Sequence, residues 1–217
     1  MMNKIKFLIV VLVFVLCASF VKAQNIQLFH NFNGENKLQP TLTLENFSQD
    51  KLGTTFYFVD IDLFETHKPT TMFIKIMRTF KLGKSPFSAH IEYNGGLIVN
   101  QNFSAPINNA YLAGFDYYLH NESHDKRLNI KLLSRFTEKA SYQVSAIWGT
   151  SWFNSDLDID GYVHYWKENG KQIIYSEPQI WFNATNFLSL GGEVKIGYNF
   201  NHSKWKATPA LGLKIKI

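Results

Sequence analysis

Hydrophobic and polar positions alternate along most of this chain, and the alternation is most regular near its C-terminus. In LSLGGEVKIGYNF (residues 188–200), apolar or aromatic side chains occupy every even-numbered position except 192, and polar residues or glycine occupy the odd-numbered ones. Successive side chains of a β-strand point to opposite faces of the sheet. The stretch therefore predicts a long two-faced strand whose apolar face contacts either a protein core or lipid.

Segments with the same two-residue period follow one another up to the C-terminus. Clusters of Gly, Pro, Asn and charged residues separate them, as turns between strands require. We expect about twelve strands of roughly ten residues each, paired in an antiparallel sheet because the turns are short. Their predicted bounds are 26–33, 40–48, 54–63, 70–80, 86–94, 109–119, 127–136, 141–150, 156–166, 171–183, 187–200 and 205–217.

The character of these strands favours a membrane barrel over a soluble sandwich. Both folds give each strand one apolar face, but these strands are long and their ends are rich in Phe, Tyr and Trp, as in barrels with aromatic girdles. Lys195 turned toward lipid would cost roughly 2–4 kcal/mol at the membrane centre, so Glu193 and Lys195 are expected to face a polar lumen. The prediction is an all-β fold, a transmembrane antiparallel β-barrel of about twelve strands.

An even number of strands returns both termini to one side of the membrane, here taken as the periplasmic side. Among the extracellular connections, NGGLIVNQNFSAPINN (residues 94–109) is expected to be the longest and to fold over the mouth of the barrel. The extracellular connections are expected around Gly34, His67, Gly96, Glu138, Asn169 and His202.

The N-terminal residues have the pattern of a secretory signal peptide. Lys4 and Lys6 precede the apolar run FLIVVLVFVLCASF, and VKA offers a cleavage site after Ala23. The apolar run is shorter than the roughly 20 residues that a membrane-spanning helix needs. We therefore expect a signal peptide at residues 1–23, a barrel at residues 24–217, and export to the bacterial outer membrane.

Composition beyond this leader argues against several classes of function. The one cysteine is Cys17, so residues 24–217 can form neither a disulfide nor a cysteine-ligated metal site. Removing three leader lysines from 22 basic residues leaves 19 against 17 acids, which gives nucleic-acid binding no support. DLDIDGYVHYWKE (residues 156–168) opens like a calcium loop but has Lys167 where a glutamate is needed. No metal, cofactor, nucleic-acid partner or catalytic residue is expected.

Five stretches, spread over nearly the whole barrel region, carry a family resemblance. They are TLTLENFSQDKLGTTFYFVDIDL (residues 41–63), SPFSAHIEYNGGL (85–97), INNAYLAGFDY (107–117), YSEPQIWFN (175–183) and TPALGLKIKI (208–217). In this order they resemble an uncharacterised Bacteroidetes family, a domain of unknown function that is similar to the Tsx nucleoside-specific channel. The resemblance implies a monomeric outer-membrane barrel of about twelve strands, with a narrow channel whose aromatic and ionisable lumen residues hold nucleosides.

The solute of such a channel is expected to contact inward-facing side chains. Glu45, Phe56, Phe58 and Asp60 are the first candidates, because ENFSQDKLGTTFYFVD (residues 45–60) matches the Tsx pattern. An aromatic ring can stack on a nucleobase, and a carboxylate can accept hydrogen bonds from ribose hydroxyls. The alternative for each residue is structural, since inward aromatics fill a narrow barrel and inward charges neutralise one another. The alternation adds Asp62, His90, Glu92, Asp116, Tyr162, Trp181, Glu193 and Lys195.

The expected function is a passive outer-membrane channel for small polar solutes, above all nucleosides, and not an enzyme. Its expected partners are outer-membrane lipid and the solute. Two other classes stay open. A barrel enzyme that acts on lipids would need Ser, His and acid side chains together near the lipid interface, and the sequence assigns no such set. A soluble periplasmic β-protein that binds a small ligand would share the alternation.

Overall fold

The protein consists of antiparallel strands joined by turns. A computed structural model describes residues 24–32, 39–62, 70–99, 103–200 and 203–217. Within these ranges no helix is long and apolar enough to cross a membrane. The strands are β1 (Asn25–Asn31), β2 (Gln39–Gln49), β3 (Gly53–Asp62), β4 (Thr70–Lys81), β5 (Phe87–Val99), β6 (Ser104–His120), β7 (Lys126–Phe136), β8 (Ala140–Trp152), β9 (Leu157–Glu168), β10 (Lys171–Ser176), β11 (Gln179–Asn183), β12 (Leu188–Tyr198) and β13 (Lys206–Lys216).

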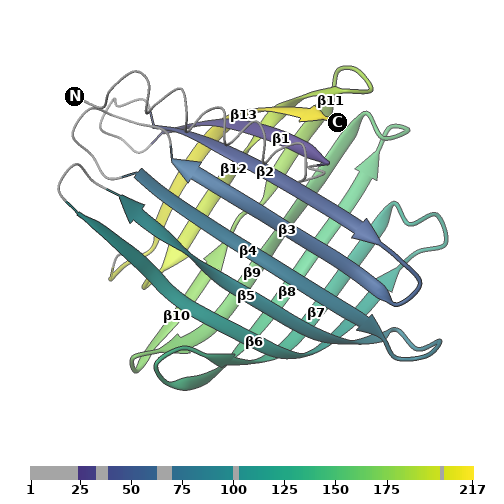
Figure 1. The fold of residues 1–217 in the computed structure, drawn as a ribbon. Coiled ribbons are helices and arrows are strands. Elements are labelled where there is room, and N and C mark those ends of the chain that lie inside the picture. Colours follow the sequence, from purple (N-terminus) through teal and green to yellow (C-terminus); the bar gives the residue numbers. More distant parts are fainter. Residues whose placement is uncertain (1–23, 33–38, 63–69, 100–102, 201–202) are drawn as a thin grey trace, which may run out of the picture.

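The strands form one closed antiparallel barrel (Figure 1). From β1 to β9, each strand pairs with the next one along the chain. β13 pairs with β12 on one side and with β1 on the other, which closes the sheet. In Figure 1 the purple β1 accordingly lies beside the yellow β13. The predicted antiparallel barrel is confirmed.

β10 and β11 are two parts of one barrel strand. Both lie between β9 and β12, and the pairs Ser176–Val163 and Gln179–Asp160 keep one register on either side of Pro178. Proline has no backbone N–H to donate to a sheet, so the ladder is interrupted where Pro178 stands. The thirteen strands therefore fill twelve positions around the barrel, which confirms the predicted strand number.

The outward face of the barrel is apolar. Phe115 of β6 and Leu132 of β7 face outward and are 57 % and 63 % exposed, while their chain neighbours Asp116 and Lys131 are buried inside. Leu211 of β13 is equally exposed, at 64 %. A water-soluble protein buries such a face, whereas a bilayer supplies an apolar solvent for it. This face favours the transmembrane barrel over a soluble β-protein.

Aromatic side chains gather at both ends of the barrel. At the end where β5 begins, the ring centroids of Phe87 and Tyr117 lie 4.8 Å apart. At the opposite end, where β12 stops, those of Tyr198 and Trp205 lie 5.1 Å apart. Amphipathic rings at these two levels are typical of the girdles that mark the membrane–water interfaces.

The connection between β5 and β6 is shorter than predicted. β5 runs to Val99 and β6 begins at Ser104, so most of the stretch 94–109, expected to be the longest loop, is strand. NGG looks like a turn, but a Cβ at Gly96 would lie 2.0 Å from the backbone oxygen of Met72. The glycine thus permits a close approach of β5 to β4, beside a register shift between β5 and β6. The predicted loop was wrong for this reason.

Phe200 departs from the predicted alternation of residues 188–200. β12 ends at Tyr198, and Asn199 turns the chain with a positive φ of 56°. The ring centroid of Phe200 lies 4.5 Å from that of Tyr175 and 5.9 Å from that of Trp166. Because Tyr175 and Trp166 occupy inward positions, Phe200 joins the inner side chains instead of the lipid face.

Asp50 holds the turn between β2 and β3. Its carboxylate accepts hydrogen bonds from the backbone N–H groups of Leu52 and Gly53 at 2.8 and 2.9 Å, and from Arg78 at 2.8 Å. The hydrogen bond from Arg78 is the main cause that lowers the pKa of Asp50 to about 2. Because the folded-state pKa lies below the unfolded one, the charged carboxylate stabilises the turn above about pH 4, and this contribution is lost as the pH falls toward 2.

Candidate functional site in the barrel lumen

Cross-strand pairs show which side chains face the lumen. Glu45 lies opposite Phe58, and Asp60 lies between Thr43 and Phe73. Paired residues of antiparallel strands point to the same face, so the register carries this assignment around the barrel. All the side chains that the sequence placed in the lumen lie on this inner face: Glu45, Phe56, Phe58, Asp60, Asp62, His90, Glu92, Asp116, Tyr162, Trp181, Glu193 and Lys195.

Three phenylalanine rings form a panel on the inner wall, here called the phenylalanine panel. Phe56 and Phe58 of β3 have ring centroids 6.0 Å apart, and Phe73 of β4 lies 5.8 Å from Phe58. All three rings are partly exposed. Phe73 was not among the predicted site residues, although its position in the alternation of β4 would have identified it. The panel offers a solute a flat aromatic surface.

Two carboxylates continue the phenylalanine panel along β3. Asp60 accepts a 2.5 Å hydrogen bond from the hydroxyl of Thr43, and Asp62 accepts a 2.8 Å hydrogen bond from that of Thr41. A carboxylate has about four lone-pair positions, so each retains capacity to accept further hydrogen bonds. Asp60 follows Phe58 on the same face, which places a hydrogen-bond acceptor next to an aromatic ring.

Lys195 of β12 faces these carboxylates. Its Nζ lies 3.3 Å from Glu193 Oε1, and it interacts electrostatically with Glu177, Asp60 and Asp62. β13, β1 and β2 separate β12 from β3 along the sheet, so the interaction with β3 passes through the lumen. We call these five side chains the Lys195 cluster. Its four carboxylates outnumber its one lysine.

Glu177 stands at the interruption between β10 and β11. The hydroxyls of Tyr162 and Tyr175 both donate to its carboxylate, that of Tyr162 at 2.5 Å. Tyr162 also stacks on His164, with ring centroids 4.6 Å apart. Tyr162, a predicted site residue, is thus oriented by Glu177, which the alternation of residues 171–183 also places on the inner face.

His90, Glu92 and Asp116 pair with one another. His90 Nε2 lies 3.2 Å from Glu92 Oε2, and His90 Nδ1 lies 2.9 Å from Asp116 Oδ1. Lys131 Nζ lies 3.8 Å from Asp116, and Lys75 Nζ lies 3.7 Å from Glu92. A buried charge is costly unless it is paired. Because these three predicted lumen residues are buried, their contacts neutralise the wall between β4 and β7.

Trp181 packs against the inner wall. A Cβ at Gly191 or Gly212 would lie 2.9 Å from the indole ring, so these two glycines make room for it. The ring centroid of Phe29 lies 5.6 Å away, and the ammonium of Lys214 lies 4.1 Å from the centroid of the indole. Trp181 is 0 % exposed. It therefore fills space beside β12 and β13 and presents no surface to a solute in this conformation.

The predicted residues fall into two groups. Those that are buried in the inner wall are His90, Glu92, Asp116, Trp181 and Glu193. Those that keep exposed surface are Glu45, Phe56, Phe58, Asp60, Asp62, Tyr162 and Lys195. The second group is concentrated on β3. The candidate site is therefore the phenylalanine panel with the neighbouring carboxylates and the Lys195 cluster.

The aspartates of the calcium-like stretch are engaged within the barrel. Asp158 accepts hydrogen bonds from Ser151 at 2.6 Å and from Asn183 at 2.8 Å, and Asp160 pairs with Arg127. Among the residues that the structure describes, no three His, Cys, Asp or Glu side chains come together as metal ligands would. The alternation of an inward polar face explains the spacing of these aspartates.

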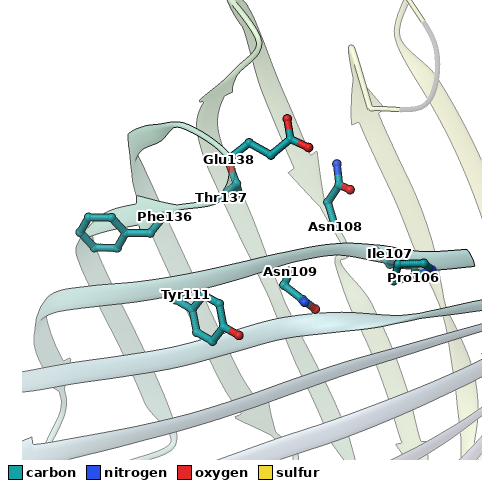
Figure 2. Close-up of a pocket in the computed structure, with 8 residues that line it drawn as sticks. All are labelled: Pro106, Ile107, Asn108, Asn109, Tyr111, Phe136, Thr137 and Glu138. Carbon is teal, nitrogen blue, oxygen red and sulfur yellow. The ribbon is translucent and has the colours of Figure 1, made fainter.

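A shallow pocket of about 390 Å³ lies at the rim of the barrel, where β6 extends beyond β7. Pairing of the two strands stops at Tyr111 and Phe136. Figure 2 shows the pocket lined by residues 106–109 and Tyr111 of β6 and by residues 136–138 at the end of β7. It shares no residue with the phenylalanine panel or the Lys195 cluster, so it is separate from the candidate site.

A protein-family model described as a domain of unknown function (DUF5020) matches residues 23–217. None of the curated proteins matches the chain. The family match covers all the strands and agrees with the uncharacterised family that the sequence resembles. The specific likeness to the Tsx channel is not part of this match.

Solved structures of porins resemble the barrel. The KdgM porin in complex with disordered oligogalacturonate aligns over 89 % of this chain and 99 % of its own, with 13 % identity and a TM-score of 0.56, and the KdgM porin alone gives the same values. The outer membrane protein Omp33 of Acinetobacter baumannii aligns over 90 % of this chain and 98 % of its own, with 10 % identity and a TM-score of 0.48. The likeness to KdgM shows a porin-type barrel fold.

Proposed function

The chain belongs to the DUF5020 family, a domain of unknown function, and we propose that it is a passive outer-membrane channel for small polar solutes. The contrast between the two faces of the closed barrel carries this proposal. Apolar residues such as Leu132 cover the outside, whereas carboxylates, lysines and hydroxyls cover the inside. A polar lumen gives hydrophilic solutes a route through a membrane that would otherwise exclude them. The porin-type fold supports the same function.

We propose nucleosides as the solute class. The phenylalanine panel offers rings on which a nucleobase can stack, and Asp60 lies beside Phe58 as an acceptor for ribose hydroxyls. Polar groups placed for a ligand's hydroxyls also discriminate against analogues that lack them. The resemblance of residues 41–63 to the Tsx pattern supports the same choice.

The charge balance of the Lys195 cluster favours neutral over anionic solutes. In the Lys195 cluster, four carboxylates face one lysine. Oligogalacturonate is present in one KdgM complex. Because each galacturonate unit carries a carboxylate, the oligomer is a polyanion, and the carboxylates of the Lys195 cluster would repel it. A nucleoside carries no net charge at neutral pH and avoids this repulsion.

Conductance in planar lipid bilayers tests the proposal. Purified protein is expected to form ion-conducting pores whose current falls reversibly when uridine or adenosine is added. Oligogalacturonate at the same concentration is expected to reduce the current less. Protein that inserts but conducts no ions would overturn the channel function. A conducting pore that no nucleoside blocks would retain the channel and overturn the nucleoside assignment.

The proposed location is the bacterial outer membrane. The leader predicted for residues 1–23 lies outside the described residues and stays part of this proposal. A monomer is the proposed unit of transport, because one chain closes its own barrel.

The orientation of the barrel gives a labelling prediction. Glu138 and Lys84 are exposed in turns at opposite ends of the barrel. With periplasmic termini, a cysteine at Glu138 is expected to react with a membrane-impermeant maleimide in intact cells. A cysteine at Lys84 is expected to react only after the outer membrane is permeabilised.

Two features make this experiment clean. Residues 24–217 contain no cysteine that would add background labelling. Lys84 is preferred over Asp50, because Asp50 holds its turn through hydrogen bonds with Arg78 and the backbone. Labelling of the Lys84 position and not of the Glu138 position in intact cells would show the inverted orientation.

A further inference from the structure

One lysine reaches across the lumen. The Nζ of Lys75 on β4 lies 3.2 Å from the Nε2 of His164 on β9. Four strands, β5 to β8, separate β4 from β9 along one side of the barrel, and the path around the other side is longer. Residues so far apart in the sheet cannot meet along the wall. The Lys75–His164 contact therefore spans the bore.

Two aromatic rings lie close to the ammonium of Lys75. Its Nζ lies 5.8 Å from the ring centroid of Phe58 and 5.6 Å from that of Tyr162. An ammonium within about 6 Å of a ring is attracted by the negative face of the ring. Phe58 belongs to the phenylalanine panel, whereas Tyr162 belongs to β9. Lys75 thus occupies the space between the two aromatic surfaces that a flat solute would use.

The hydrogen bonds fix which partner can move. An ammonium only donates hydrogen bonds, so His164 Nε2 accepts from Lys75 and carries no proton. His164 Nδ1 then carries the proton and donates it to the Ser145 hydroxyl, 2.8 Å away. The imidazole is also stacked on Tyr162. His164 is held at two points by its ring. Lys75 ends a flexible four-carbon stem, and its second partner, Glu92, lies 3.7 Å away on the neighbouring strand β5. Lys75 is therefore the partner that swings away from the contact, toward the wall at Glu92.

Side chains of β4 and β7 also meet inside the barrel. Lys131 Nζ of β7 lies 3.1 Å from the sulfur of Met77 on β4, which gives a second contact between strands that are not neighbours. Leu112 and Leu133, inward residues of β6 and β7, are buried against each other. Because these contacts occupy the wall from β4 to β7, a solute is expected to pass on the side of the phenylalanine panel, where Lys75 stands in its way.

We propose that Lys75 and His164 form the constriction of the channel and that Lys75 determines which solutes pass it. This inference rests on the proposed channel function. A solute passes when the ammonium leaves His164. The ammonium then loses its hydrogen bond to His164. An uncharged solute with hydrogen-bond acceptors and a flat ring replaces this hydrogen bond and stacks on Phe58 or Tyr162. A cation is repelled by Lys75, and an anion is repelled by the Lys195 cluster.

Two substitutions separate the length of Lys75 from its charge. Lys75→Ala removes both and is expected to raise the single-channel conductance. Lys75→Met keeps a stem of similar length without the charge and is expected to raise it less. Both variants are expected to shift the reversal potential in a KCl gradient toward the potassium equilibrium potential, because a fixed positive charge has left the constriction. Lys139→Met, the same change in an exposed turn, is expected to alter neither quantity.

Chemical restoration of the charge gives a second readout on one folded protein. In Lys75→Cys, the thiolate attacks aminoethyl methanethiosulfonate, a mixed disulfide forms and methanesulfinate leaves, so that residue 75 again carries an ammonium. The conductance of Lys75→Cys is expected to exceed that of the wild type, to fall on modification, and to recover when a thiol reductant cleaves the disulfide. The same reagent on Lys139→Cys is expected to leave the current unchanged.

Substitution of His164 tests whether its contact with Lys75 limits the conductance. His164→Ala is expected to raise the conductance, and the double variant with Lys75→Ala is expected to conduct no more than Lys75→Ala alone, because the two changes break one contact. Lys75→Ala that inserts normally with the wild-type conductance and reversal potential would overturn the constriction. Wild type that inserts without conducting ions would instead overturn the channel function on which this inference rests.

Discussion

Leu132→Lys is expected to destabilise the folded barrel strongly in a membrane. Leu132 lies near the middle of β7 and points outward, between the inward Lys131 and Leu133. A lysine on the lipid face near the midplane costs roughly 2–4 kcal/mol. Typical proteins are stable by about 5–15 kcal/mol, so this change removes a large part of the margin. The folded fraction is measured by heat-modifiable gel mobility and by urea titration in lipid vesicles.

Two controls separate the effect of a charge deep in the membrane from the effect of losing the leucine side chain. Phe136→Lys also faces outward but lies at the end of β7, near the interface, where a lysine costs only about 0–1 kcal/mol. Leu132→Ile keeps the apolar surface. Both controls are expected to fold nearly as well as the wild type. If Leu132→Lys had the same urea midpoint as these controls, the outward face of β7 would not contact lipid.

The strands were predictable because each has one face toward lipid and one toward a polar lumen. The segments predicted at 127–136 and 141–150 differ by one or two residues from β7 and β8. Along β7 the apolar Leu128, Ile130 and Leu132 face outward and the polar Asn129 and Lys131 face inward. A charged residue is tolerated on only one face near the membrane centre. Contact with lipid therefore produces the alternation from which the strands were predicted.

The alternation gave wrong predictions where backbone geometry, and not contact with lipid, determines the local structure. Gly96 looks like part of a turn, yet it lies within β5, where the backbone of β4 leaves no room for a Cβ. Phe200 continues the alternation in the sequence, yet Asn199 turns the chain before it. A local pattern carries no information about the neighbouring strand or about where a strand stops.

The candidate site was predictable only as a set of inward positions. Alternation placed Trp181 and Phe58 on the same face of the barrel, but it did not distinguish the buried indole from the partly exposed ring. That difference arises from Gly191 and Gly212 on strands distant in sequence from most of the site. The Lys75–His164 contact depends in the same way on closure of the barrel, which brings β4 opposite β9.

Phe58→Ala is expected to weaken block of the channel by nucleosides while the barrel stays folded. Phe58 is the middle ring of the phenylalanine panel, within 6.0 Å of Phe56 and 5.8 Å of Phe73 between centroids. Stacking of a base on an aromatic side chain contributes about 1–3 kcal/mol in single-stranded nucleic-acid binders. At about 1.4 kcal/mol per tenfold change, the nucleoside concentration for half-block is expected to rise roughly five- to 150-fold. Titration of single-channel current with uridine and adenosine measures it.

Phe115→Ala is the matched control for this prediction, because it removes the same ring from the outward face of β6. Its effect on nucleoside block is expected to be negligible. Phe56→Ala is expected to weaken the block as well, since Phe56 extends the panel beside Phe58. Purines stack over a larger area than pyrimidines, so the loss is expected to be greater for adenosine than for uridine. If nucleosides block the pore with equal half-block concentrations in Phe58→Ala, Phe115→Ala and wild type, the phenylalanine panel does not contact the solute.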